Sequence, residues 1–327
     1  MEIGKLPPAL LEELILNKLT TRRKEVLVRS ATGQDSSILT TDHRPVVLST
    51  DPITGEVDQI GWFAVHVACN DVAANGAEPL GVLLTLLLPP GCDNQTIAEI
   101  MNDASKAAAE LNVDILGGHT ELTDAVNRPV VSTTAVGVLR TDQLIVSSAV
   151  RAGLDIVLTK GAGIEGTAIL AGSKLPELAK VDQELMQQAR DLFSQLSVVP
   201  ESEIAVRLGA VAMHDVTEGG VLGALYEVVQ AGKCGFMIDF SKIPILPATQ
   251  AICSVLKIDA LRLISSGSML IFIDKAEDLV DELQRQGIKA ACIGKTTVSQ
   301  KYLLKHHHNV TEVDPPESDE LWRVLSR

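Results

Sequence analysis

Five short segments of the chain place acidic or histidine side chains beside glycines or at the ends of apolar stretches. They are Gly33-Gln34-Asp35, Ser49-Thr50-Asp51, Asn70-Asp71, Gly117-Gly118-His119-Thr120-Glu121 and His214-Asp215-Val216-Thr217-Glu218-Gly219-Gly220. Mg²⁺ prefers hard oxygen ligands and usually shares them with phosphate groups, and glycine lets backbone amides approach phosphates closely. Because no nucleophile motif accompanies the five segments, together they indicate a site for a metal and a triphosphate.

Taken one at a time, these segments have simpler interpretations. Asp51 precedes Pro52 and is compatible with a turn cap, and Asp215 or Thr217 is compatible with a helix capping box. Asp71 is more informative, because it lies near the end of an otherwise apolar helix, where a carboxylate needs a partner or a metal. The helix that begins after Gly219-Gly220 presents its N-terminus as a natural seat for phosphate.

Three other motifs do not support a function. The Gly161–Gly166 segment matches a dinucleotide fingerprint, but the acidic strand end expected about 20 residues later is missing. Gly294-Lys295-Thr296 resembles the end of a P-loop, yet Lys289 stands where its first glycine belongs. His306-His307-His308 is predicted to be a solvated loop, since consecutive residues do not face one site.

Composition excludes several classes of protein. The 327 residues carry a net charge of −14 and show no basic stripe, which argues against nucleic-acid binding. The five cysteines are far apart without a Cys-x-x-Cys motif, as expected for free thiols in a reducing compartment. With no signal-peptide layout and no apolar run of about 18 residues, the chain is predicted to be cytoplasmic and not to contact a membrane.

The pattern of apolar residues predicts an α+β protein of two domains, 1–148 and 149–327. With 46% hydrophobic but only 3% aromatic residues, its cores must be mainly aliphatic. Helices are expected at 7–19, 60–75, 96–111, 166–171, 182–196, 201–208, 220–230 and 276–286. Strands are expected at 25–29, 36–39, 46–49, 79–88, 113–116, 129–138, 155–159, 235–239, 268–273 and 289–293.

The order of the motifs resembles the AIR-synthase superfamily over nearly the whole chain. The motifs are GQDSSIL, STDP, NDVAANGAEP, GGHTE, HDVTEGG and ISSGSMLI, and NDVAANGAEP is the most specific of them. This group contains aminoimidazole ribonucleotide synthetase (PurM), the hydrogenase-maturation protein HypE, thiamine-monophosphate kinase and selenophosphate synthetase. The GGHTE motif and the ending PPESDELW look most like the HypE-like, AIR synthase-related branch.

The resemblance implies a PurM-like fold whose N-terminal sheet dimerises into a barrel, so that the protein would be a homodimer. It also implies ATP and Mg²⁺ in the cleft between the two domains. The residues carried over are Asp35, Asp51, Asp71 and Asp215 for the metal; Gly33, Asn70, Gly117, Gly118, Glu121 and Thr217 for the nucleotide; and His119 or His214 as general acid or base.

Two departures from the family pattern affect the expected activity. Gln34 replaces an acid that many members carry, and no cysteine follows Cys292, whereas HypE carries its reacting group on a terminal cysteine. The leading hypothesis is an ATP-dependent enzyme that phosphorylates an amide, carbonyl or phosphate oxygen of a small molecule or of a protein tail. The alternatives are a catalytically silent nucleotide-binding partner and a kinase resembling thiamine-monophosphate kinase.

Overall fold

The computed structural model describes residues 26–28, 31, 33–34, 36–40, 44–55, 59–315 and 318–326. Asp35 and the helix predicted at 7–19 lie outside the described residues. The chain divides into two compact units, and each is considered by itself. The N-terminal unit contains Arg23–Arg29 and Asp35–Leu144, and the C-terminal unit contains Ile145–Arg327 together with Ser30–Gln34.

The N-terminal unit is built on a mixed sheet with strand order β1-β2-β3-β6-β4-β5. Neighbouring strands are antiparallel except β4 and β5, which are parallel. The strands are β1 (Val26–Val28), β2 (Ser37–Leu39), β3 (Val46–Ile53), β4 (Ala77–Leu88), β5 (Asp114–Leu122) and β6 (Val130–Leu139).

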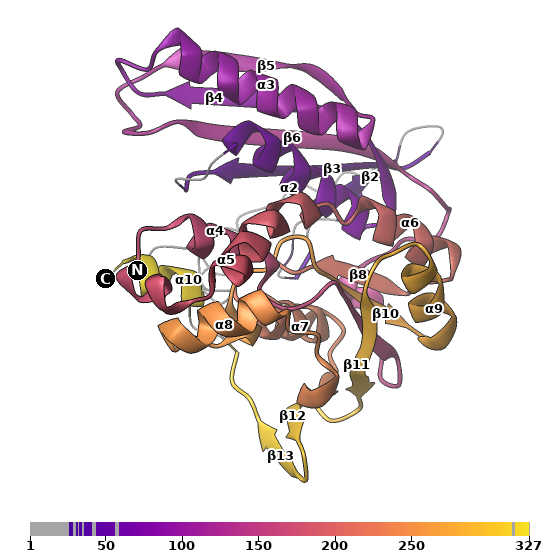
Figure 1. Cartoon of the computed structure of the whole chain (residues 1–327). Coiled ribbons are helices and arrows are strands. Elements are labelled where there is room, and N and C mark those ends of the chain that lie inside the picture. Colours follow the sequence, from indigo (N-terminus) through magenta and orange to yellow (C-terminus); the bar gives the residue numbers. More distant parts are fainter. Residues whose placement is uncertain are drawn as a thin grey trace. The chain divides into compact units, whose positions relative to one another are not determined.

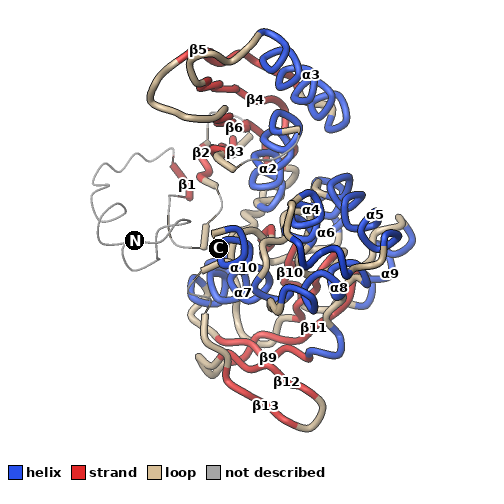
Figure 2. The backbone as a smooth tube through the Cα atoms, turned by 60° about the vertical axis from the view of Figure 1, so that its left-hand side comes forward, coloured by secondary structure: helices blue, strands red, loops and turns tan. Residues whose placement is uncertain are grey.

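Two helices, α2 (Ile60–Ala74) and α3 (Asn94–Leu111), lie on one side of this sheet (Figure 2). Apart from its first residue, α2 is buried throughout, because it packs on β3, β4 and β6 and is also in contact with α3. A Cβ added to Gly137 in β6 would lie 2.5 Å from a methyl group of Val72, so the contact between helix and sheet is close. Asp93 begins α3 by accepting a hydrogen bond from the Thr96 amide.

The opposite face of the sheet has no helix over it among the described residues. Leu83 and Thr134 are paired across β4 and β6, and both side chains point to this face. The hydroxyl of Thr134 forms a hydrogen bond with the hydroxyl of Thr50, and this bond is exposed to solvent. The Leu83 residue is 42% exposed, and Leu116, which lies over Gly81, is 58% exposed. An apolar sheet face is therefore open to solvent in a single chain.

The GGHTE motif lies inside a strand, whereas it was expected to follow one. Strand β5 continues to Leu122, with Gly117 and Gly118 at φ 145° and 149°. A Cβ on Gly118 would lie 1.8 Å from the carbonyl oxygen of Leu84 in the neighbouring strand. The glycine pair is therefore required by the backbone path of the strand, independently of any ligand.

The C-terminal unit is built on a second sheet with strand order β13-β12-β9-β11-β7-β10-β8, and only β12 and β9 run parallel. Its strands are β7 (Asp155–Thr159), β8 (Ala212–Asp215), β9 (Gly235–Asp239), β10 (Met269–Ile273), β11 (Ala290–Thr297), β12 (Tyr302–His306) and β13 (Asn309–Glu312). Its α-helices are α4 (Ile164–Gly172), α5 (Gln183–Asp191), α6 (Val199–Arg207), α7 (Gly220–Ala231), α8 (Pro247–Leu256), α9 (Glu277–Arg285) and α10 (Glu320–Leu325).

Two apolar clusters organise this unit. One packs α7 against the sheet and contains the fully buried Leu158, Phe236 and Phe272. The other joins α4, α5, α8 and α10. Strand β8, helices α8 and α10 and the β12–β13 hairpin were not among the expected elements. The hairpin extends away from the rest of the unit (Figure 1), with His306 ending β12 and His307 in its turn.

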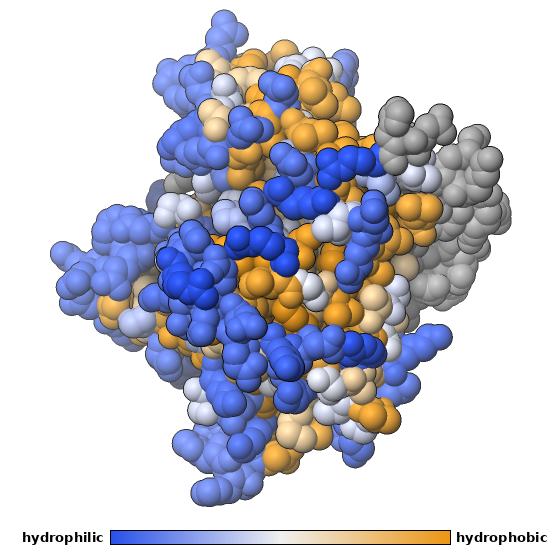
Figure 3. Space-filling view, turned by 90° about the vertical axis from the view of Figure 1, so that its right-hand side faces the viewer, coloured by the Kyte–Doolittle hydropathy of each residue, from blue (hydrophilic) through white to orange (hydrophobic). Residues whose placement is uncertain are grey.

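The visible surface of the protein is mainly hydrophilic (Figure 3). In the view of Figure 3, hydrophilic side chains cover most of the visible surface and hydrophobic patches are smaller. In the part of the chain that the structure describes, no helix is long and apolar enough to cross a membrane.

Candidate functional site

The N-terminal unit brings two of the predicted metal ligands to the same side of its sheet. Asp71, in the last turn of α2, is buried, and its Oδ2 accepts a hydrogen bond from the Ser49 hydroxyl of β3. Asp51 lies two residues after Ser49 on the same strand, so its side chain points to the same face. The carboxylates of Asp51 and Asp71 thus both belong to the face of the sheet that α2 covers.

The oxygen atoms near Asp51 suit a hard cation and a phosphate. Thr133 is directly paired with Asp51 across β3 and β6, and its buried hydroxyl has no hydrogen-bond partner among the described residues. Carboxylate and hydroxyl oxygens are the ligands that Mg²⁺ accepts. Among the described residues, no group of three or more His, Cys, Asp or Glu side chains is arranged so that it could hold a metal ion without other ligands. The residues present therefore fit a cation that is shared with phosphate oxygens.

The Asn70-Asp71 segment lies in an environment of low polarity. Asn70 is fully buried, and the pKa of Cys69 is raised to about 12 by burial and, secondarily, by the charge of Asp71. Five residues later, Asn75 is also buried and accepts a hydrogen bond from the Ser36 hydroxyl. Sequence reasoning overlooked Asn75, although it belongs to the NDVAANGAEP motif; it attaches the end of α2 to the segment that follows Asp35.

His119 and Glu121 lie on the other face of the same sheet. His119 is paired with Thr85 and Glu121 with Leu87, and these positions alternate with the buried Leu84, Leu86 and Leu88. The His119 Nε2 atom lies 3.2 Å from Glu121 Oε2, and both side chains are largely exposed. Within one chain, the structure therefore does not bring His119 and Glu121 together with Asp51 and Asp71.

In the C-terminal unit, His214 is held by a carboxylate. His214 is buried in β8, and its Nε2 atom lies 3.1 Å from Glu227 Oε2 of α7. Gly33 packs on the same residue, since a Cβ at Gly33 would lie 2.5 Å from the Glu227 carbonyl oxygen. Asp215 follows His214 and is buried at the end of the strand. His214, Asp215, Gly33 and Glu227 thus belong to one neighbourhood, and of these Glu227 was not predicted.

The loop that carries Thr217 is closed by an acid from the far end of the chain. Asp319 accepts hydrogen bonds from the backbone amides of Gly219, at 2.6 Å, and of Ile264 and Leu321. Burial is the largest influence on this carboxyl and raises its pKa to about 6, although the three amides act in the opposite direction. Thr217 is partly buried, and its carbonyl accepts the Gly220 amide at the start of α7.

Glu165 is a second functional candidate that sequence reasoning missed. It lies in the first turn of α4, is 4% exposed, and accepts a hydrogen bond from the Ser266 amide. Its pKa is raised to about 7, first by burial and to a smaller extent by the charges of Asp319 and Asp215, although the hydrogen bonds from Ser266 act in the opposite direction. The only signal in the sequence was an acid inside the glycine-rich Gly161–Gly166 segment.

This raised pKa gives the protein a pH-dependent stability. Because the folded pKa of Glu165 lies above its ordinary value of 4.5, the folded state binds more protons than the unfolded state between these values. The contribution is complete below about pH 4.5 and is lost as the pH rises towards 7. We expect Glu165→Gln to reduce the fall in unfolding free energy between pH 5 and 7.5 by about 2 kcal/mol.

The measurement is urea denaturation of both proteins at each pH, in EDTA so that no divalent cation contributes. The variant should keep part of the fall in unfolding free energy with pH, because the pKa of Asp319 is raised as well. Identical pH slopes for wild type and Glu165→Gln would contradict the assignment. Glu184→Gln, which changes an exposed acid of the same unit, is the matched control.

Comparison with known proteins places this architecture in a family. The model of the AIR synthase related protein N-terminal domain matches residues 31–139, and that of its C-terminal domain matches residues 151–307. A putative hydrogenase expression/formation protein of Methanocaldococcus jannaschii is 27% identical over 98% of this chain and 97% of its own length. The carbamoyl dehydratase HypE of Rhodobacter capsulatus is 29% identical over 69% of this chain and 65% of its own length.

A crystal structure of the hydrogenase maturation protein HypE in complex with ATP has the same fold. It aligns with a TM-score of 0.74 at 22% identity and covers 98% of this chain and 97% of that chain. The predicted α+β, PurM-like architecture with an N-terminal and a C-terminal domain of this type is confirmed. The chain therefore belongs to the AIR synthase related family of enzymes and is similar to its HypE hydrogenase-maturation members.

Proposed function

We propose that this protein is an ATP-dependent enzyme that activates an amide, carbonyl or phosphate oxygen of its substrate by phosphoryl transfer. The observation that carries the proposal is the shared orientation of Asp51 and Asp71, with Ser49 and Thr133 beside them, on the helix-covered face of the N-terminal sheet. The names of the HypE relatives, one of which was solved with ATP, support this activity.

In this proposal Asp51 and Asp71, together with Asp35, hold Mg²⁺, which neutralises phosphate charge when it is bound. Phosphoryl transfer needs positioning and charge neutralisation more than covalent help, so three acids without a catalytic triad suffice. Asn70 is assigned to orienting Asp71 or to a phosphate contact. The nucleotide-contacting residues that we propose are Gly33 and Thr217, and Asp215 adds a metal or phosphate contact. The family resemblance also suggests Gly117, Gly118 and Glu121, which lie on β5, with Glu121 on the other face of the sheet from Asp51 and Asp71.

His214 and His119 are the proposed proton carriers. Glu227 accepts a hydrogen bond from the His214 ring when Nε2 carries a proton, which orients the imidazole. His119 has the same kind of partner in Glu121, but it is exposed to water, where such a contact is weak. We therefore assign the general acid or base to His214 first.

The acceptor is proposed to be a small molecule or a tail of a partner protein and not one of the four thiols of Cys69, Cys234, Cys253 and Cys292. Cys69, Cys234 and Cys253 are buried, and burial raises the pKa of each. The pKa of the half-buried Cys292 is also raised, first by burial. A thiol with a raised pKa is a poor nucleophile at neutral pH, so a substrate from outside the chain is the simpler source of the reacting oxygen.

The test is a calorimetric titration of ATP into the protein, with Mg²⁺ and with EDTA. We expect Mg²⁺-dependent binding, followed by release of ADP when an amide or phosphate acceptor is added. If ATP binds but no acceptor is ever phosphorylated, the catalytically silent binding partner, which the neutral Gln34 favours, is the better description. A diphosphate product from a phosphorylated acceptor would favour the kinase alternative. No ATP binding would overturn the proposal.

We also propose a homodimer that forms through the open face of the N-terminal sheet. The exposed Leu83 and Leu116 support this, since single chains rarely leave such a face in water. Leu83→Glu is expected to turn the dimer into a monomer in sedimentation equilibrium, because the carboxylate would be buried without a partner. The control is Leu325→Glu, another exposed leucine outside this face. A wild-type monomer at all concentrations would contradict the proposal.

A further inference from the structure

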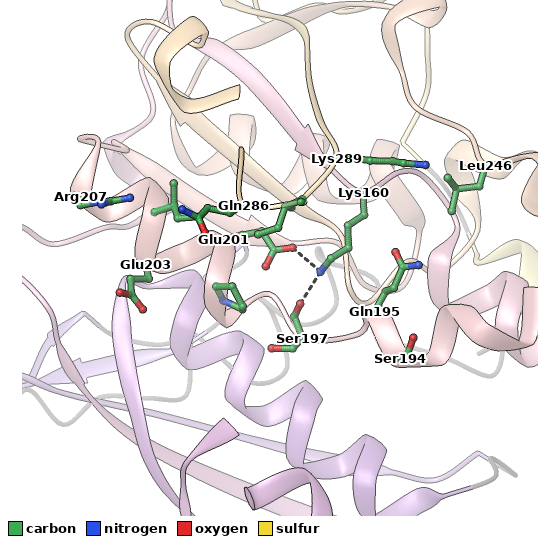
Figure 4. A pocket seen from close by; sticks show the side chains of 14 residues that line it. Lys160, Ser194, Gln195, Ser197, Glu201, Glu203, Arg207, Leu246, Gln286 and Lys289 are labelled. Carbon is green, nitrogen blue, oxygen red and sulfur yellow. Dashed lines mark hydrogen bonds and ion pairs between the residues drawn. The ribbon is translucent and has the colours of Figure 1, made fainter. Parts of the chain in front are cut away.

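The C-terminal unit contains a pocket of about 770 Å³ that none of the proposed catalytic residues lines (Figure 4). Its walls come from the residue after β7, the segment before α6, helix α6 as far as its last residue, the residue before α8 and the loop between α9 and β11. Most of the lining residues are polar or charged, but apolar atoms make up slightly more of the lining surface, with Ile204, Leu246 and Ile288 among the contributors. A pocket of this size is large enough for a small metabolite.

The interior of the pocket is held rigid by a buried ion pair. The ammonium group of Lys160 lies against Glu201 Oε1 and donates a hydrogen bond to the carbonyl of Ser197, at 2.6 Å (Figure 4). It donates another to the carbonyl of Gly267, at 2.9 Å. Glu201 is 1% exposed, and the three donors of Lys160 are all used. The pair is neutral as a whole, so it shapes the pocket without supplying a free charge.

Two cations remain to interact with a ligand. Lys289 has no ion-pair partner among the described residues and points, in Figure 4, towards the side of the pocket lined by Leu246 and Gln195. Arg207 lies at the other end of the pocket and uses only part of its guanidinium on Glu282, at 3.1 Å. The side-chain amide of Gln195 makes no hydrogen bond to another described residue, and it can turn a donor towards a ligand beside Lys289.

We propose that this pocket binds a small organic anion, phosphorylated or carboxylated, whose negative group lies on Lys289 and Gln195 and whose far end reaches Arg207. Cations beside a partly enclosed, apolar wall attract an anion more strongly than they do in open water. The lining holds three cations, Lys160, Lys289 and Arg207, and two acids, Glu201 and Glu203, so in a chain with a net charge of −14 this pocket favours an anionic over a cationic ligand. Phosphate and carboxylate share this chemistry, and the experiment distinguishes them.

The probes are inorganic phosphate and succinate, each titrated into the full-length protein by calorimetry at low ionic strength. We expect at least one of them to bind at millimolar concentration, and the stronger one identifies the ligand class. Lys289→Glu should weaken this binding at least tenfold, because it replaces attraction by repulsion. Lys275→Glu, which makes the same charge change at an exposed site outside the pocket, should leave it unchanged.

Asp71→Asn separates this pocket from the proposed nucleotide site, and it should bind the probe as well as wild type. The inference is overturned if wild type binds neither probe, if Lys289→Glu binds as wild type does, or if binding is lost in Asp71→Asn but kept in Lys289→Glu. The pocket lies wholly in the C-terminal unit, whereas Asp51 and Asp71 belong to the N-terminal unit. The result of the anion titration therefore does not decide the result of the ATP titration.

Discussion

Replacing Asp71 by asparagine is expected to lower Mg²⁺-dependent ATP binding and turnover by about 100-fold or more, with little change in stability. Asparagine keeps the size of the side chain, and its carbonyl oxygen can still accept the hydrogen bond from Ser49. What disappears is the negative charge that the proposed metal–phosphate site requires; even supporting residues of metal sites cost 10- to 100-fold when they are changed.

The measurement combines titration of ATP with Mg²⁺ and an assay of ADP release. Asp124→Asn is the matched control, because it removes an exposed acid of the same unit. Thermal unfolding must show that the Asp71 variant is folded. Equal ATP affinity for Asp71→Asn and wild type would remove Asp71 from the site, and a loss of equal size in Asp124→Asn would point to a general effect of charge.

The second large effect is expected at the buried pair of Lys160 and Glu201. Lys160→Met should lower the free energy of unfolding by about 3–5 kcal/mol, because Glu201 would remain buried and charged without its partner. The carbonyls of Ser197 and Gly267 would lose their donor as well. Urea denaturation measures the change.

Two further variants show whether the buried charge is the cause. Lys301→Met removes an exposed pair with Glu312 and should cost less than about 1 kcal/mol. The double variant Lys160→Met/Glu201→Leu should recover much of the loss, because a buried ion pair can be replaced by apolar side chains at little cost. A Lys160→Met protein as stable as Lys301→Met would contradict the buried-pair explanation.

Local patterns in the sequence were sufficient for most of the secondary structure. The apolar stretch that predicted a helix at 60–75 forms α2, Ile60–Ala74, and the strands predicted at 155–159 and 235–239 have the observed bounds. Helix and strand periodicity, glycine and proline report local conformation, which neighbouring residues determine. The overlooked β12–β13 hairpin has little buried surface, so its sequence lacks the apolar alternation that would reveal it.

Local sequence patterns could not predict on which face of the N-terminal sheet each site residue lies. Asp51 and His119 both belong to strands of one sheet, and the sequence suggested a single site for them. The strand register places Asp51 beside Thr133 on the covered face and His119 beside Thr85 on the open face. Which face a residue occupies depends on pairing between distant strands, and a shift by one residue reverses it.

By itself the sequence determined the family and the α+β class, because these follow from short motifs and local periodicity, and the same motifs suggested Asp51, Asp71 and Asp215 as the acids of the proposed site. Tertiary structure alone decided that Glu165 receives a hydrogen bond from Ser266 and Asp319 one from Gly219, each across about 100 residues of chain. Burial, and with it the raised pKa of both carboxyls, results from packing between distant segments. No local pattern records that packing, since the surroundings of a side chain are set only when the chain has folded around it.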